Sequence, residues 1–160
     1  MSTSGTLCNS SQFARVDAVA DPQSAARIRR EFSDWLRRYF TLDATKISDI
    51  VLAVNEAMAN AAEFAYAAVN RLGTMNVKAQ FDGRAATLTV TVTDQGAWRT
   101  ADAATKEPKR GRGLPLMHAL ADRAAVDSSQ AGTRVCLEWN HVTAAGAQPG
   151  QRTRSASPGR

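Results

Sequence analysis

The stretch Val51-Leu-Ala-Val-Asn-Glu-Ala-Met-Ala-Asn60 lies inside a longer segment with the apolar repeat of an amphipathic helix, which we expect from Lys46 to about Asn70. The buried side should comprise the apolar residues that recur at helical spacing, namely Ile47, Ile50, Val51, Val54, Met58, Ala61 and Ala65. Glu56 and Asn60 stand four residues apart, so they should point close together and away from that side. Their small neighbours Ala53, Ala57 and Ala59 would let a bulky group approach the helix closely.

Apolar patterns and turn signals predict the remaining elements. We expect strands over 13–19, 74–81, 86–93, 124–127 and 133–139, and helices over 22–40 and 114–121. The first of these strands could be an edge strand. Residues 95–113 have no apolar period and should form a long loop of the kind that often serves as a lid. The order of elements predicts an α/β (α+β) two-layer sandwich, with a mixed, mainly antiparallel sheet and helices on one face.

Composition predicts one globular domain over 13–142 between an unstructured N-terminus, 1–12, and an unstructured basic tail, 143–160. The tail holds three arginines and no acid, which is more than half of the net charge of +5. It could be merely solvated, or it could contact an acidic partner. The first predicted helix also has a basic face, which could be a solvated surface or a docking surface, formed by Arg27, Arg29, Arg30, Arg37 and Arg38.

Several function classes are disfavoured by what the chain lacks. The two cysteines, Cys8 and Cys136, are not clustered as a disulfide framework or metal site would require. No secretion signal is evident and no apolar run is long enough to span a membrane, so we expect a cytoplasmic protein with no membrane contact. Direct nucleic-acid binding is disfavoured, because much of the positive charge lies in the tail and the loop and no aromatic platform accompanies it.

Two segments contain carboxylates suited to chemistry. Glu56 could act as a general base toward a hydroxyl, and the amide oxygen of Asn60 is a hard ligand suited to Mg²⁺. Both could equally occupy the wet face of the helix. Further on, Asp94-Gln-Gly96 follows a β-branched strand. Asp94 could accept a hydrogen bond from an exocyclic amine such as that of adenine, and Gly96 would allow close approach to the ring, although an ordinary turn has the same pattern.

The segment Arg110-Gly-Arg-Gly113 precedes the short predicted helix. Backbone N–H groups at Gly111 and Gly113 and the positive end of the helix dipole would favour phosphate, and Lys109, Arg110 and Arg112 add positive charge. A plain helix start after a flexible loop is the alternative. The hydroxyl of Thr133 could join a purine-binding network or simply belong to a good strand former. His118 and His141 have no catalytic partner pattern and should be structural.

Taken together, the three segments resemble the motifs of the Bergerat-fold ATP-binding superfamily of gyrases, heat-shock chaperones, histidine kinases and mismatch-repair ATPases. Glu56-Ala-Met-Ala-Asn60 matches its N-box, Asp94-Gln-Gly96 its G1 box and Gly111-Arg-Gly113-Leu114 its G2 box. Within that superfamily, the small size and the phrase Gly113-Leu-Pro-Leu-Met117 resemble the bacterial anti-sigma factor serine kinases.

This resemblance implies an ATP- and Mg²⁺-dependent switch that regulates transcription as a homodimer. Such kinases sequester an alternative sigma factor and phosphorylate a serine of a STAS-type anti-anti-sigma antagonist. By the match, Glu56 would be the base, Asn60 would hold Mg²⁺, Asp94 would bind the adenine amine, and Gly111 to Leu114 would bind the phosphates. A catalytically idle, nucleotide-gated regulator of the same fold is the alternative.

The chain departs from the motifs at two positions. Trp98 replaces the second glycine of the G1 box, and Phe64 stands where related N-boxes often have histidine. Neither residue has an assigned chemical role, so the resemblance implies ATP binding more firmly than phosphoryl transfer, whose electrostatic demands are stricter.

Overall fold

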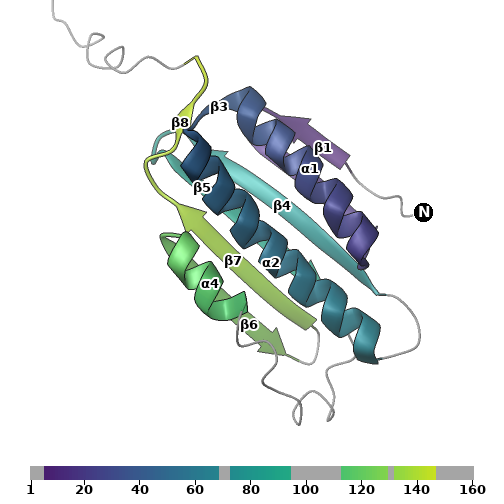
Figure 1. Ribbon diagram of the computed structural model, residues 1–160. Helices are drawn as coiled ribbons and strands as arrows, with labels where there is room; N and C mark the ends of the chain where they lie inside the picture. Colours follow the sequence, from purple (N-terminus) through teal and green to yellow (C-terminus); the bar gives the residue numbers. More distant parts are fainter. Residues whose placement is uncertain (1–5, 69–72, 95–112, 130–131, 147–160) are drawn as a thin grey trace, which may run out of the picture.

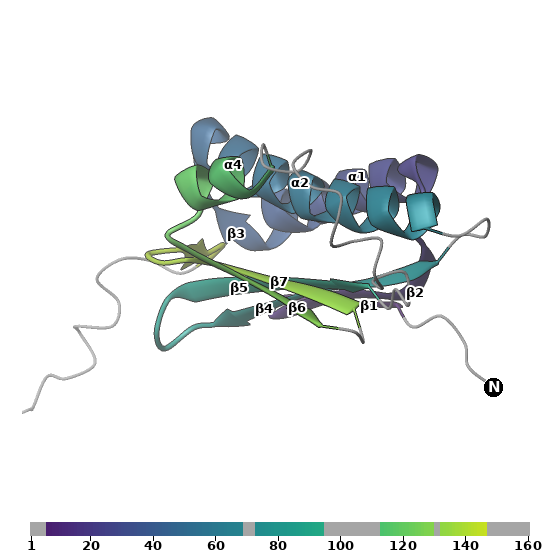
Figure 2. The same ribbon diagram turned by 90° about the horizontal axis from the view of Figure 1, so that it is seen from below.

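The structure, a computed structural model, describes residues 6–68, 73–94, 113–129 and 132–146. These residues form two layers, with helices covering one face of a six-stranded sheet (Figures 1 and 2). The helices are α1 (Pro22–Tyr39), α2 (Ala44–Ala68) and α4 (Gly113–Leu120). The strands of the large sheet are β1 (Thr6–Asn9), β2 (Gln12–Val19), β4 (Thr74–Asp82), β5 (Thr87–Asp94), β6 (Arg123–Ser129) and β7 (Gly132–Trp139). The short strands β3 (Phe40–Thr41) and β8 (Thr143–Ala144) pair with each other.

The large sheet has the strand order β1-β2-β4-β5-β7-β6, and each neighbouring pair is antiparallel. The predicted two-layer sandwich with a mainly antiparallel sheet is therefore confirmed. The hairpin of β4 and β5 pairs along its whole length, from Met75 opposite Asp94 to Asp82 opposite Thr87. Since β5 lies in the middle of the sheet, its last residue is flanked by a strand on each side.

Capping side chains start the two long helices. The Oδ1 atom of Asp21 accepts a hydrogen bond of 2.7 Å from the backbone N–H of Ser24, and Pro22 occupies the first turn of α1. The Oδ1 atom of Asp43 accepts an equivalent bond of 2.7 Å from the N–H of Lys46 at the start of α2. Each cap satisfies a backbone donor that the helix itself leaves without a partner.

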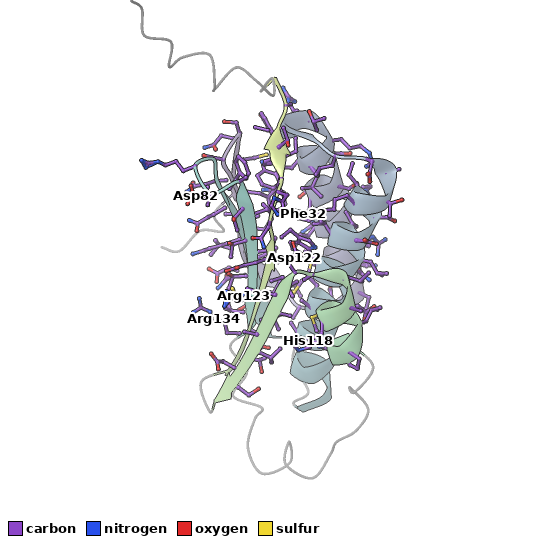
Figure 3. All side chains as sticks on the ribbon, turned by 90° about the vertical axis from the view of Figure 1, so that its left-hand side faces the viewer. Phe32, Asp82, His118, Asp122, Arg123 and Arg134 are labelled. Atoms are coloured by element: carbon purple, nitrogen blue, oxygen red, sulfur yellow. The ribbon has the colours of Figure 1, made fainter. Side chains whose placement is uncertain are left out.

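The core lies between the helices and the sheet. An aromatic group anchors it at the α1 side, where Phe13 of β2 contacts Phe32 and Trp35 of α1 with ring centroids 5.4 and 5.7 Å apart. Figure 3 shows Phe32 between the two layers, while Arg123 and Arg134 lie on the sheet face that has no helices. Along β5, Leu88, Val90 and Val92 alternate inward with threonines outward, as expected for a sheet covered on one face.

Two expectations about the chain ends are wrong for the residues that the structure describes. Residues 6–9, expected to be unstructured, form β1 and pair with β2, so β2 is not the edge strand. Thr143 and Ala144, expected in the tail, pair as β8 with Phe40 and Thr41. Both segments are short and weakly patterned, so tertiary pairing rather than local sequence orders them. No described helix is long and apolar enough to cross a membrane.

Candidate functional site

Asp94, the last residue of β5, is a buried carboxylate at the end of an apolar stripe. It is 6% exposed and continues the inward-facing series Leu88, Val90 and Val92. A charged group in such a position needs polar partners, because burial removes it from water. Its Oδ1 atom accepts a long hydrogen bond of 3.4 Å from the backbone N–H of Thr133. The core would favour a hydrophobic side chain at position 94. The sequence instead places a hydrogen-bond acceptor there, the carboxylate of Asp94, which faces the helices.

The neighbours of Asp94 follow from strand register. Thr133 of β7 lies directly opposite it on one side, and Met75 of β4 on the other. Thr133 in turn pairs with Ser128 of β6, and their hydroxyl oxygens are 3.4 Å apart. The structure thus brings together Asp94 and Thr133, which the sequence placed 39 positions apart. Met75 and Ser128 were not predicted as neighbours of the site, because only the register of the assembled sheet reveals them.

Glu56 and Asn60 lie on α2, which packs on β4, β5 and β7. Both side chains are half-buried, so they lie at the margin of the buried side rather than fully away from it. Of the small neighbours expected to leave room for a bulky group, only Ala59 is exposed. Ala53 and Ala57 are 0% and 1% exposed, so protein atoms already cover them. These two alanines allow close packing of α2 within the domain, and the expectation of an open surface above them is wrong.

The short helix α4 begins at Gly113, close to its predicted start, and lies beside α2. Its C-terminal end is tied to the sheet, because the indole Nε1–H of Trp139 donates a hydrogen bond of 2.8 Å to the backbone oxygen of Leu120. Figure 2 shows that its N-terminal end points toward the end of the domain where α2 finishes and β7 begins. The positive end of the α4 dipole is directed there.

One end of the domain therefore collects three kinds of groups. Asp94 and Thr133 lie at the end of the sheet, the half of α2 with Glu56 and Asn60 lies above, and α4 directs its N-terminus toward them (Figures 1 and 2). A buried acceptor suits an exocyclic amine, an amide oxygen suits a hard cation, and a helix N-terminus suits phosphate. These groups fit the base and the phosphates of a nucleotide.

Several predicted site residues lie outside the described residues. These are Gly96, Lys109, Arg110, Gly111 and Arg112, together with Trp98. For Leu114 and Phe64 the helix is described but the side chain is not. Their predicted roles stay predictions. His118 and His141 are both exposed, and Figure 3 shows His118 on α4. Among the described residues, no three His, Cys, Asp or Glu side chains cluster as a metal site would need, so a metal role for Asn60 also stays a prediction.

Comparison with known proteins identifies the family of the domain. Residues 18–139 match the family described as "Histidine kinase-like ATPase domain". Among solved structures, the chain is similar to the crystal structure of the RsbU and RsbW domains of Rv1364c from Mycobacterium tuberculosis, with 25% identity and a TM-score of 0.63. The similarity covers 86% of this chain and 34% of that one, so this chain spans about a third of the length of the solved chain. No curated protein matches the chain.

Proposed function

Because the chain belongs to the histidine kinase-like ATPase domain family, we propose that it is an ATP-binding anti-sigma factor with serine/threonine kinase activity. It would sequester an alternative sigma factor and phosphorylate a STAS-type anti-anti-sigma antagonist on serine. The similarity to the structure containing an RsbW domain and the resemblance of the three sequence motifs support this proposal. The single observation that carries it is the buried carboxylate of Asp94 beside Thr133, at the end of the domain toward which α4 points.

Asp94 and Asn60 would perform the binding step. The carboxylate of Asp94 would accept a hydrogen bond from the adenine amine, a contact that rejects bases without a donor there. Asn60 would contribute one oxygen to Mg²⁺, which commonly takes only one or two protein ligands and completes its shell with water and phosphate oxygens. The N-terminus of α4, with Gly111 to Leu114, would hold the phosphates.

Glu56 would perform the proton transfer. When bound, ATP would supply the γ-phosphoryl group that the serine oxygen receives. The carboxylate of Glu56 would take the hydroxyl proton of that serine as its oxygen bonds to phosphorus, and ADP would leave with the electron pair of the broken bond. Half-burial suits this role, since a partly desolvated carboxylate on a helix is held in place yet can be reached by a partner's side chain.

Labelled ATP, Mg²⁺ and the STAS protein from the neighbouring gene test the proposal directly. We expect label on a serine of that protein, reduced by about 10²–10⁴-fold in Glu56→Gln while nucleotide affinity stays within about twofold. Asp49→Asn is the matched control, because it also converts a half-buried α2 carboxylate to an amide but lies outside the three motifs.

Three results would contradict the assignment or part of it. If the wild-type chain binds ATP and never transfers phosphate, the protein is the catalytically idle, nucleotide-gated regulator instead. If calorimetry with millimolar Mg²⁺ detects no ATP binding at all, both proposals fail. Equal loss of transfer in Asp49→Asn would show that general disturbance of α2, and not proton transfer by Glu56, explains the effect.

A further inference from the structure

A groove of about 380 Å³ runs between α1 and α2. Figure 1 shows the two helices side by side. On α1 the groove is lined by Arg29, Ser33 and Arg37, which are not among the residues that α1 buries in the core. On α2 its lining ends at Asn55. It therefore shares no residue with the site formed by Glu56, Asn60, Asp94 and Thr133.

The α2 side of the groove is mostly apolar, with Ser48 and Asn55 as its polar lining residues. Ile47 is 8% exposed and Val51 is half-buried, while Leu52 is 41% exposed. Leu52 is one of three large hydrophobic side chains that are exposed in the described part of the chain, and it lies in a concave surface. A single exposed leucine needs no explanation, but one that adjoins an apolar floor in a groove is typical of a binding surface.

The α1 side of the groove is basic. A guanidinium N–H of Arg29 donates a hydrogen bond of 3.1 Å to Oδ1 of Asn55, and one of Arg37 donates to the hydroxyl of Ser33. Both acceptors are neutral, so they orient the guanidinium groups without compensating their charge. Within the described residues neither arginine makes an ion pair, whereas Arg15 pairs with Glu31 at 2.7 Å.

In the part of the chain that the structure describes, neither an ion pair nor an acidic lining residue compensates the charge of Arg29 and Arg37. The groove is lined by no acidic residue, and Glu31, one of two acids on α1, is already paired with Arg15. The tail beyond Gly146 has arginine as its only charged residue type, so it has the same sign as the groove. Charge complementarity therefore indicates an acidic occupant that comes from another molecule.

We propose that the groove binds an acidic amphipathic helix of a partner protein. Its apolar face would pack on Ile47, Val51 and Leu52, and its carboxylates would pair with Arg29 and Arg37. These arginines are eight residues apart on α1, which is about 12 Å along the helix axis. Carboxylates seven or eight residues apart on the partner helix match that separation, so the bound segment spans at least two turns. This interaction needs neither the nucleotide nor phosphoryl transfer.

A synthetic helical peptide tests the proposal without knowledge of the natural partner. The probe is a fluorescein-labelled peptide of about 18 residues with a leucine face and two glutamates at the required spacing, added to the full chain while fluorescence anisotropy is measured. We expect a dissociation constant on the order of micromolar. Arg29→Glu with Arg37→Glu should weaken binding at least about tenfold, because two attractions become repulsions. Leu52→Gln should weaken it by about three- to tenfold.

The matched control is Arg27→Glu with Arg84→Glu, which makes the same change in net charge at two exposed positions outside the groove. Its affinity for the peptide should equal that of the wild type. Equal weakening in this control would overturn the proposal, because binding would then follow overall charge. Absence of binding, or equal binding of a peptide with lysines in place of the glutamates, would also overturn it. Thermal melts by circular dichroism verify that each variant is folded.

Two other occupants have distinct signatures. If the groove variant converts a dimer into a monomer in sedimentation equilibrium, the occupant is a second copy of the chain. If truncation after Gly146 markedly tightens peptide binding, the tail occupies the groove. Either result would overturn the proposal.

Discussion

Trp139→Phe should separate the contribution of α4 to nucleotide binding from its contribution to stability. Trp139 is 1% exposed and donates its indole N–H to the backbone oxygen of Leu120 at 2.8 Å, at the C-terminal end of α4. Phenylalanine retains most of the buried ring but removes the donor, so a helix-terminal carbonyl loses its partner. Leaving such a group without a hydrogen bond costs about 1–3 kcal/mol. At about 2 kcal/mol per molar urea, the unfolding midpoint should fall by roughly 0.5–1.5 M.

The matched variant is Trp35→Phe. Trp35 is 2% exposed and donates an equivalent hydrogen bond of 2.7 Å to the backbone oxygen of Asn9 in β1, far from the candidate site along the sheet order. Trp35→Phe should lower the stability about as much as Trp139→Phe does, as measured by urea denaturation monitored with circular dichroism. Only Trp139→Phe should weaken binding of a fluorescent ATP analogue, by about three- to tenfold or up to about 1.4 kcal/mol, because only it loosens α4.

The reasoning is refuted if the two variants weaken nucleotide binding equally, since loss of affinity would then follow general loosening of the fold. It is also refuted if Trp139→Phe leaves the urea midpoint unchanged. In that case the hydrogen bond to Leu120 would contribute nothing to the stability of the domain.

Three further predictions concern the packing of α2, the helix caps and the buried carboxylate. Ala57→Leu should lower the free energy of unfolding by about 1–3 kcal/mol through overpacking, whereas Ala59→Leu, on the exposed side, should change it by less than about 0.5 kcal/mol in urea titrations. Asp21→Ala and Asp43→Ala should each lower the free energy of unfolding by about 0.5–2 kcal/mol, measured in thermal melts, because each removes an N-cap acceptor. An unchanged stability in either variant would contradict the capping geometry. Asp94→Asn should preserve the fold by circular dichroism and weaken ATP binding at least about tenfold by calorimetry, and unchanged affinity would exclude Asp94 as the adenine acceptor.

The sequence predicted the elements well where local chemistry defines them. Asp21-Pro22 marked the start of α1, and the apolar repeats predicted both long helices to within a few residues. Alternation along 86–93 predicted β5 as a strand buried on one face. Such signals are readable because side-chain period and capping depend on residues only a few positions apart.

The chain ends could not be predicted in this way. Residues 6–9 have no strong strand pattern, and Thr143 and Ala144 are a pair within a segment of small residues, yet both form strands. Each is ordered by a partner strand that is already in place, so its stability comes from pairing and not from local propensity.

By itself, the sequence determined which residues have suitable chemistry at the site: Glu56 and Asn60 one helical turn apart, and Asp94 after its strand. Only the tertiary structure decided that Asp94 is buried beside Thr133 and that Ala53 and Ala57 lie in the core. It also decided that Arg29 and Arg37 of α1 face the mostly apolar lining of α2 across a groove. The physical reason is that helical and strand periods specify which side of an element a residue occupies, whereas contacts between elements arise only when the layers pack together.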